Sequence, residues 1–191
     1  MGMRVKNRNI QQKMTDQLKK YNLVYNEESG LYDCEGDVNV EKDLVSPDGK
    51  LIIKFGVVKG DFDCSVNKLT SLEGVPQVVG GDFDCYNNQL TSLEEAPQEV
   101  DRSFRCSKNQ LTSLEGAPKK VGGNFNCKYN KLTSLEGSPK EVGGDFCCDN
   151  NDNLIFDETH FYGCLPDVIG GKLKAGYDCD YELTKEYYDK K

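Results

Sequence analysis

The chain has 191 residues, and its 32 Asp and Glu exceed its 24 Lys and Arg, giving a formal net charge of −8 at pH 7. An acidic chain of this kind is not expected to have general affinity for nucleic acid or for an anionic membrane surface. No apolar run approaches the about 18 residues that a membrane span requires, and the start MGMRVKNRNI lacks the apolar stretch of a secretory signal. We therefore expect a cytoplasmic protein without a membrane anchor.

Residues 1–30 form a basic N-terminal segment that precedes any repeat. Ile10, Met14, Leu18 and Tyr21 follow helical spacing, which predicts a helix over residues 9–21 with one apolar stripe. Two interpretations of this helix compete. It caps the first coil of a repeat array, whose ends expose apolar edges and open strands, or it binds a partner or a second copy of the chain.

Residues 31–59 are predicted to form a divergent first coil. Residues 31–34 and 36–40 have the pattern of short strands, and residues 36–40 align with residues 60–64 at a spacing of 24 residues. The tetrapeptide Ser-Pro-Asp-Gly at residues 46–49 predicts a tight turn within this coil.

Residues 60–151 contain four copies of one 21-residue repeat and the opening of a fifth. The positions that recur without a slip are Phe62, Phe83, Phe104, Phe125 and Phe146, then Cys64, Cys85, Cys106, Cys127 and Cys148, then Asn67, Asn88, Asn109, Asn130 and Asn151. Self-similarity at a fixed period of this size is typical of a solenoid, in which each copy is one coil stacked on the next.

Within one repeat, Phe83 and Cys85 alternate with polar residues, which predicts one short strand per coil with one buried face. Strands of successive coils should pair in parallel, so that Phe stacks on Phe and Cys on Cys. The paired glycines before the strand suit a corner where side chains would collide or a positive φ is needed. Asn88 follows the strand, where a column of buried amides would satisfy backbone groups of its own turn and of the neighbouring coil.

The other side of each repeat reads Thr-Ser-Leu-Glu, as at residues 91–94. With Thr as N-cap and Glu three residues later, this pattern has the form of a capping box and predicts a single helical or 3₁₀ turn. The Gly-x-Pro that follows in three of the four full copies should end that turn.

Residues 152–191 are predicted to form a stretched last coil and a C-terminal cap. Residues 166–175 echo residues 139–148 at a spacing of 27, with Leu173 and Ala175 as the core pair. The insertion at residues 157–163 is expected to form a longer helical turn. The tail from residue 177 should either close the C-terminal edge or remain disordered.

The string F-x-C-x-x-N-x-L resembles the L-x-L-x-x-N-x-L consensus of leucine-rich repeats, with Phe62 and Cys64 in the leucine places of the strand, Asn67 as the asparagine and Leu69 as the closing leucine. The longer pattern GGDFxCxxNxLTSLEGxPxxV is similar to short repeats in many proteins encoded by tailed bacteriophages. The resemblance covers residues 36–156. It implies a short right-handed solenoid, poor in regular helix and strand, and a viral origin, and it supplies no active site.

Nine cysteines raise the question of disulfides or zinc. The five at the 21-residue interval occupy a buried strand position, so we predict free thiols that pack as small apolar side chains. A zinc site from Cys147, Cys164, Cys179 and His160 matches no standard spacing. A calcium site on the strands is disfavoured because the carboxylates do not persist in the third coil. With one histidine and no catalytic motif, we predict no catalysis, no metal and no cofactor.

The outward strand positions vary while the core positions do not, which is expected of a surface that recognises a partner and equally of exposed positions that drift. Carboxylates gather in the early coils and cations in the later ones, and the tyrosines suit interface anchors. The candidate partner-binding residues are Asp61, Asp63, Asp82, Asp84, Tyr86, Arg105, Lys108, Lys128, Tyr129 and Lys131.

From these features we predict a non-enzymatic module that binds another protein, and from the resemblance a host protein in the host cytoplasm, with an effect on host defence or host machinery. One alternative is a structural role in a virion or its assembly. Another is an acidic decoy that mimics nucleic acid. Self-association through the N-terminal helix or the caps is also open.

Overall fold

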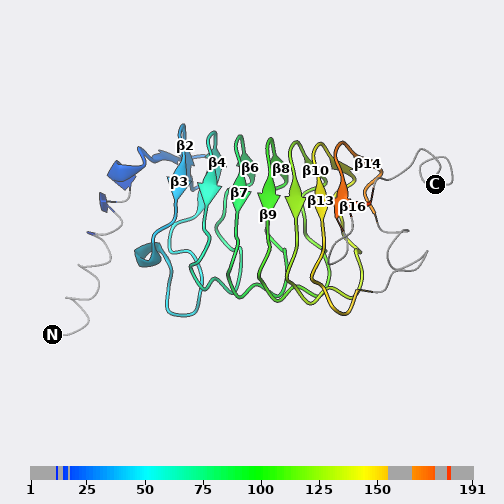
Figure 1. Cartoon of the computed structure of the whole chain (residues 1–191). Coiled ribbons are helices and arrows are strands. Elements are labelled where there is room, and N and C mark those ends of the chain that lie inside the picture. The colour runs from blue at the N-terminus through cyan, green and yellow to red at the C-terminus, as the bar shows by residue number, and fades with distance from the viewer. Residues whose placement is uncertain (1–11, 13–14, 17, 155–164, 175–179, 182–191) are drawn as a thin grey trace.

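The computed structural model shows a β-solenoid whose coils follow one another along a single axis (Figure 1). The structure describes residues 12, 15, 16, 18–154, 165–174, 180 and 181. Regular helix is scarce in these ranges: residues 12, 15, 16 and 18–20 are helical, and one 3₁₀ helix, η1 (Lys42–Leu44), lies in the first coil. The predicted solenoid class is therefore confirmed, with very little helix.

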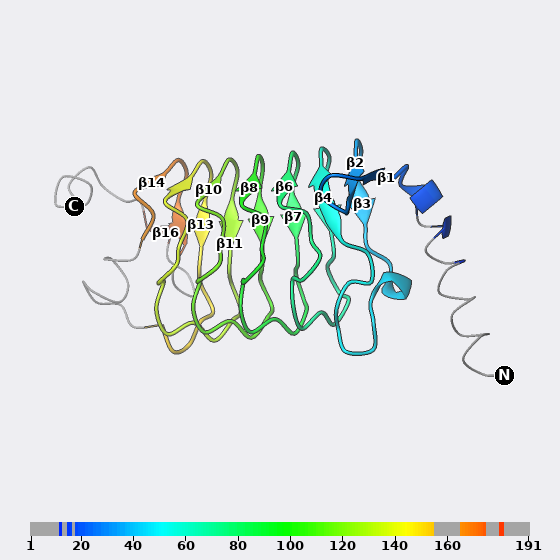
Figure 2. The ribbon, with the colours of Figure 1, turned by 180° about the vertical axis from the view of Figure 1, so that it is seen from behind.

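Each coil contributes two short strands, so the prediction of one strand per coil is wrong. The strands form two eight-stranded sheets that run along opposite sides of the coils (Figures 1 and 2). Sheet A comprises, in order, β1 (Val24–Asn26), β2 (Leu31–Cys34), β4 (Phe55–Val58), β6 (Val78–Val79), β8 (Glu99–Val100), β10 (Lys120–Val121), β12 (Glu141–Val142) and β14 (Val168–Ile169). Sheet B comprises β3 (Val38–Asn39), β5 (Phe62–Asp63), β7 (Phe83–Asp84), β9 (Phe104–Arg105), β11 (Phe125–Asn126), β13 (Phe146–Cys147), β15 (Leu173–Lys174) and β16 (Asp180–Tyr181).

The parallel register follows the repeat. Phe83 pairs with Phe104 in sheet B and Val100 pairs with Val121 in sheet A, each at the 21-residue spacing. The first coil is offset by 24 residues, since Val38 pairs with Phe62, and the last by 27, since Leu173 pairs with Phe146. Both irregular coil lengths predicted from the sequence are confirmed.

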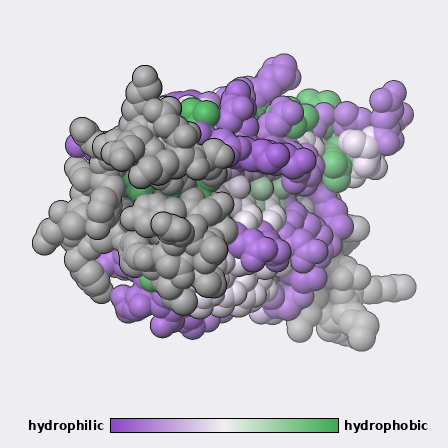
Figure 3. Space-filling model, turned by 90° about the vertical axis from the view of Figure 1, so that its right-hand side faces the viewer, coloured by the Kyte–Doolittle hydropathy of each residue, from purple (hydrophilic) through white to green (hydrophobic). Residues whose placement is uncertain are grey.

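Columns of identical side chains fill the space between the sheets. The rings of Phe62, Phe83, Phe104, Phe125 and Phe146 stack with centroids 5.1–5.8 Å apart. Beside them lies the predicted thiol column, whose members Cys64, Cys85, Cys106, Cys127 and Cys148 are buried and free. In one view along the axis, hydrophilic residues cover much of the described outer surface (Figure 3). Apolar burial thus runs continuously from coil to coil, which is how a repeat too small to fold alone is stabilised.

A column of buried amides holds successive coils together, as predicted. Asn88 Nδ2 donates to the carbonyl oxygens of Cys64 and Cys85, each at 3.0 Å. Asn88 Oδ1 accepts from the backbone N–H groups of Asn67 (3.1 Å) and Leu69 (2.9 Å). One side chain therefore satisfies four backbone groups in the turn that follows the sheet B strand. These buried groups need no water as a partner.

The paired glycines stand at corners where the coils approach most closely. A Cβ at Gly122 would lie 2.0 Å from the carbonyl oxygen of Asp101, and one at Gly143 would lie 2.1 Å from that of Gly122. Neither glycine has a positive φ. The collision, and not the backbone conformation, explains why side chains are absent here.

The Thr-Ser-Leu-Glu segment forms a turn, so the predicted capping box with a helical or 3₁₀ turn is wrong. Serine replaces threonine as the acceptor: the N–H of Glu94 donates to Ser92 Oγ at 2.9 Å. The N–H of Ala117 donates to the carbonyl oxygen of Leu114 at 3.0 Å, and Gly116 between them has a φ of +89°. A positive φ at the third position of a four-residue turn is incompatible with a continuing helix.

Antiparallel strands end one sheet at each end of the solenoid. At the N-terminal end β1 pairs with β2, and at the C-terminal end β16 pairs with β15. Tyr21 and Leu23 pack against the first coil, which supports a capping role for this segment. Of the helix predicted over residues 9–21, the described residues 12, 15, 16 and 18–20 are helical. Residues 9–11, 13, 14 and 17, the insertion at 157–163, Ala175 and most of the tail lie outside the described residues.

Candidate functional site

The ten predicted site residues lie along one side of the solenoid, on or just after the strands of sheet B. Five belong to β5, β7 and β9 or to the residue before them, and five belong to the turns that follow. The structure therefore brings them to one continuous surface. Their roles on that surface differ from row to row.

The residues that directly precede the sheet B strands form one row along the solenoid, and their side chains hold successive coils together. Asp61 Oδ1 accepts the backbone N–H of Asp82 at 2.7 Å, and Asp82 Oδ1 accepts that of Ser103 at 2.9 Å. The next coils continue with Ser103 Oγ and Asn124 Oδ1 as acceptors. The row varies among Asp, Ser and Asn, yet every member presents an acceptor oxygen to the following coil. The variation was predicted to reflect exposure, whereas the structure shows an acceptor oxygen that all four residues share.

The second row is also tied to the backbone. Asp63 Oδ1 accepts the N–H of Ser65 and Asp84 Oδ1 accepts that of Tyr86, both at 2.8 Å. These contacts to the residue two positions later are Asx-type turns, and they direct the chain out of the strand. The carboxylates of the early coils are thus occupied by backbone donors.

Arginines of the third coil neutralise the acidic cluster. Arg105 Nη1 lies 2.9 Å from Asp82 Oδ2 and 3.9 Å from Asp84 Oδ2. Arg102, which replaces a corner glycine and was not predicted as a site residue, lies 3.7 Å from both Asp61 and Asp82. The predicted separation of acidic early coils from basic later coils is therefore bridged by ion pairs.

The pKa values of the two carboxylates move in opposite directions. Burial raises the pKa of Asp84, and the neighbouring charge of Asp63 adds to that effect. Burial also acts to raise the pKa of Asp82, but the N–H of Ser103 and the guanidinium of Arg105 outweigh it and lower the value. Asp82 is thus stabilised in its charged form and Asp84 is not.

The turn after the strand carries a cluster of one lysine and two tyrosines from three successive coils. Lys108 Nζ lies 5.2 Å from the ring centroid of Tyr86 and 5.8 Å from that of Tyr129. Lys108 and Tyr129 occupy the left-handed region, with φ of +52° and +54°. This backbone conformation turns both side chains away from the core, and the Tyr129 side chain is 52% exposed. We call Tyr86, Lys108 and Tyr129 the aromatic–lysine cluster.

The remaining cations of the later coils, Lys128 and Lys131, differ in exposure and in their contacts. Lys128 Nζ is 3.0 Å from Asp149 Oδ2, in an ion pair whose side chains are mostly covered. Lys131 Nζ lies 3.4 Å from Gln110 Oε1 and is exposed. Lys131 therefore extends the cationic surface beside the aromatic–lysine cluster, whereas Lys128 serves the packing of two coils.

The described residues offer no arrangement for a metal ion: no group of three or more His, Cys, Asp or Glu side chains among them is suited to hold one. Burial raises the pKa of the column thiols Cys64, Cys85 and Cys127 well above the usual range. His160, Cys164 and Cys179 lie outside the described ranges. Among the residues that the structure places, no helix is long and apolar enough to cross a membrane.

Comparison with protein-family models, with curated proteins and with solved structures found no match for this chain.

Proposed function

We propose that the chain is a non-enzymatic module that binds another protein through the surface around the aromatic–lysine cluster. The observation that carries the proposal is the position of Lys108 Nζ over the rings of both Tyr86 and Tyr129. Tyrosine is among the residues that dominate the energetics of protein interfaces, and cation–π contacts gain strength when a partner removes water from them. A cluster already ordered in the free chain loses little side-chain entropy on binding.

The chemistry of the cluster indicates the partner. Lys108 is an exposed cation beside two aromatic rings, Lys131 is an exposed cation two residues after Tyr129, and the carboxylates Asp82 and Asp84 already accept backbone hydrogen bonds. We propose a partner surface that places carboxylates against the two lysines and an apolar side chain against Tyr129. Complementary charge would steer the encounter, and the ring would supply buried area.

The wider setting is proposed from the resemblance of the repeat to bacteriophage-encoded proteins. On that basis the partner is a host protein in the host cytoplasm, with a defence factor or part of the host machinery as the class to be tested. We favour this over a decoy that mimics nucleic acid, because the early carboxylates that suggested a decoy are paired with backbone N–H groups and with Arg102 and Arg105.

The test is quantitative recovery of proteins from a bacterial lysate on immobilised wild-type chain and on matched variants. Tyr129→Ala and Lys108→Glu should each reduce the recovery of the specific partner by about tenfold or more. Tyr25→Ala is the matched control, since Tyr25 is 53% exposed, close to the 52% of Tyr129, but lies in β1 at the N-terminal end. A protein that all three variants retain equally, or no protein above background, would contradict the proposal.

A further inference from the structure

From β4 to β14 the outward strand residues of sheet A, unlike the residues that directly precede the sheet B strands, accept no backbone N–H from the next coil; in β2, by contrast, Asp33 Oδ1 accepts the N–H of Val57 at 2.8 Å. Between adjacent strands this sheet is joined by backbone hydrogen bonds, such as Gln98 N to the carbonyl oxygen of Gln77 at 2.8 Å. The outward position of successive strands, from β4 to β14, is occupied by Val57, Val78, Glu99, Lys120, Glu141 and Val168.

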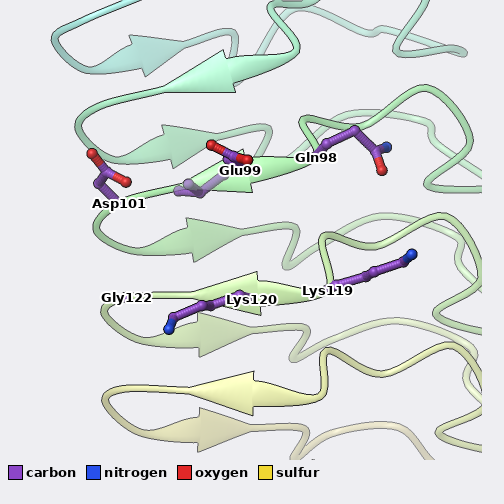
Figure 4. A pocket seen from close by; sticks show the side chains of 7 residues that line it. Gln98, Glu99, Asp101, Lys119, Lys120 and Gly122 are labelled. Atoms are coloured by element: carbon purple, nitrogen blue, oxygen red, sulfur yellow. The ribbon is translucent and has the colours of Figure 1, made fainter.

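The centre of this face is hollowed. A depression of about 510 Å³ lies over β8 and β10 and is lined by both strands and by the corners that follow them. Figure 4 shows Lys120 running toward the Gly122 corner, with Asp101 at the same corner of the preceding coil. Carboxylates thus border one coil of the depression and ammonium groups the next.

The charges that border the depression are incompletely paired. Lys120 Nζ is 2.9 Å from Glu141 Oε2, on the side away from Glu99. Among the described residues, Glu99, Asp101 and Lys119 form no ion pair, and all three are exposed. Two carboxylates therefore face outward beside two ammonium groups at the middle of this face.

We propose that this face binds a second copy of the chain about a two-fold axis that runs parallel to the strands, between β8 and β10. Such an axis reverses the order of the coils and keeps each position along the strand. Lys120 of each copy then lies opposite Glu99 of the other and near Asp101. In the outer strands Val57 lies opposite Val168, whose side chains are 38% and 54% exposed.

The pattern selects this axis over its neighbours. An axis through β10 would place Lys120 against Lys120 and Glu99 against Glu141, both unfavourable like-charge contacts. An axis along the solenoid would place Glu99 against Glu99. A shift to between β10 and β12 would pair Lys120 with Glu141, but it would place Glu99 against Val168 and leave β4 and β6 without an opposing strand. The axis between β8 and β10 places Val78 opposite Glu141, yet it opposes all six strands, joins opposite charges at the centre and pairs Val57 with Val168 at the outer strands, as a self-complementary interface requires.

The experiment measures the mass of the chain in solution by light scattering and sedimentation, at chain concentrations from about 1 μM to 1 mM. We expect a dimer whose dissociation constant falls in this range. Glu99→Lys and Lys120→Glu should each weaken it by about tenfold or more, because the symmetry loses two contacts per substitution. Glu136→Lys, which makes the same change of charge in an exposed turn, should leave the dimer unchanged.

The decisive step is to mix the two single variants. One copy then carries lysine at both positions and the other carries glutamate at both, so every central contact is again between opposite charges and the dimer should return. The double variant Glu99→Lys/Lys120→Glu should also dimerise by itself. A chain that stays monomeric throughout overturns the proposal. So does a dimer that either single substitution leaves intact, or a mixture that fails to reassociate while circular dichroism shows both variants folded.

Discussion

The two outer faces of the solenoid follow the same 21-residue period but obey different constraints. Outside sheet B, a row of Asp, Ser and Asn side chains accepts a backbone N–H from the next coil, and the amides of the asparagine column satisfy the turn. Outside sheet A, the outward positions from β4 to β14 are occupied by valine, glutamate or lysine, and these side chains accept no backbone N–H from the next coil. Sequence variation alone therefore does not mark a recognition surface. Residue types at one repeat position can vary and still be constrained, because each of them must supply an acceptor oxygen to the next coil.

The largest effect is expected from the asparagine column. Asn88→Ala removes an acceptor for two N–H groups and a donor to two carbonyl oxygens, all in a buried turn. We expect a loss of about 3 kcal/mol or more in the free energy of unfolding, measured by denaturant titration. The neighbouring exposed substitution Gln89→Ala should cost less than about 0.5 kcal/mol. Equal effects would mean that water replaces the amide.

The next effect is expected where the two faces meet. Gly122→Ala puts a Cβ 2.0 Å from the carbonyl oxygen of Asp101, so coils three and four must separate locally. We expect a cost of about 1–3 kcal/mol by thermal or denaturant unfolding. Gly36→Ala is the control, because a Cβ there meets no atom within 4 Å. A Gly122→Ala protein as stable as wild type would show that the corner relaxes freely.

A matched pair of carboxylates compares the two faces directly. Asp82 and Glu141 each lie 2.9 Å from a cation, Arg105 and Lys120, but only Asp82 also accepts a backbone N–H. Asp82→Ala should cost about 1 kcal/mol. Glu141→Ala should change stability by no more than about 0.5 kcal/mol, as exposed ion pairs usually do. The reverse order would remove the distinction between the faces.

The cost of Asp82→Ala should depend on pH. Its folded pKa is lowered, so its contribution is fully present above the unfolded pKa of about 3.9 and is lost as the pH falls through the folded value. Unfolding measured between neutral pH and strongly acidic pH should show the wild-type and variant curves converging at the acidic end. A constant difference would assign the effect to packing.

The smallest effect should have the opposite sign. The folded pKa of Asp84 is raised, mainly by burial, so its ionised form costs stability above that pKa and costs nothing below the unfolded value. Asp84→Asn keeps an acceptor for the N–H of Tyr86 and removes the charge, as Asn126 does naturally toward Lys128. We expect a gain of less than about 1 kcal/mol at neutral pH that disappears in acid. A loss at neutral pH would show that the weak contact with Arg105 outweighs burial.

The stacked coils, the buried thiols, the amide column and the unequal end coils were predictable because each follows from residues that recur at a fixed interval. The strands β6, β8, β10 and β12 of sheet A were missed since each has two residues, of which one, such as Val79 or Val100, is buried, and no second apolar residue continues the alternation as Cys85 does after Phe83. The Thr-Ser-Leu-Glu turn was misassigned because its sequence fits a capping box. The positive φ of the glycine that follows, which rules out a helix, is seen only in the structure.

The candidate site was found only in outline. Its residues could be placed on one surface from the repeat alone. The division between structural and free side chains needed coordinates, because the contact of Lys108 with Tyr86 and Tyr129 joins residues of three coils at two different repeat positions. The acceptor row did leave a signal in the sequence, since Asp61, Asp82, Ser103 and Asn124 are all short side chains that carry oxygen.

The antiparallel strands at the two ends belong to different sheets, β1 to sheet A and β16 to sheet B. A further coil arriving at either end would have to lie parallel to both sheets at once, and at each end one of the two sheets presents a neighbour of the wrong direction. Head-to-tail growth into a fibre, a hazard for any stack of unpaired edges, is thereby discouraged by strand polarity rather than by charge or bulk.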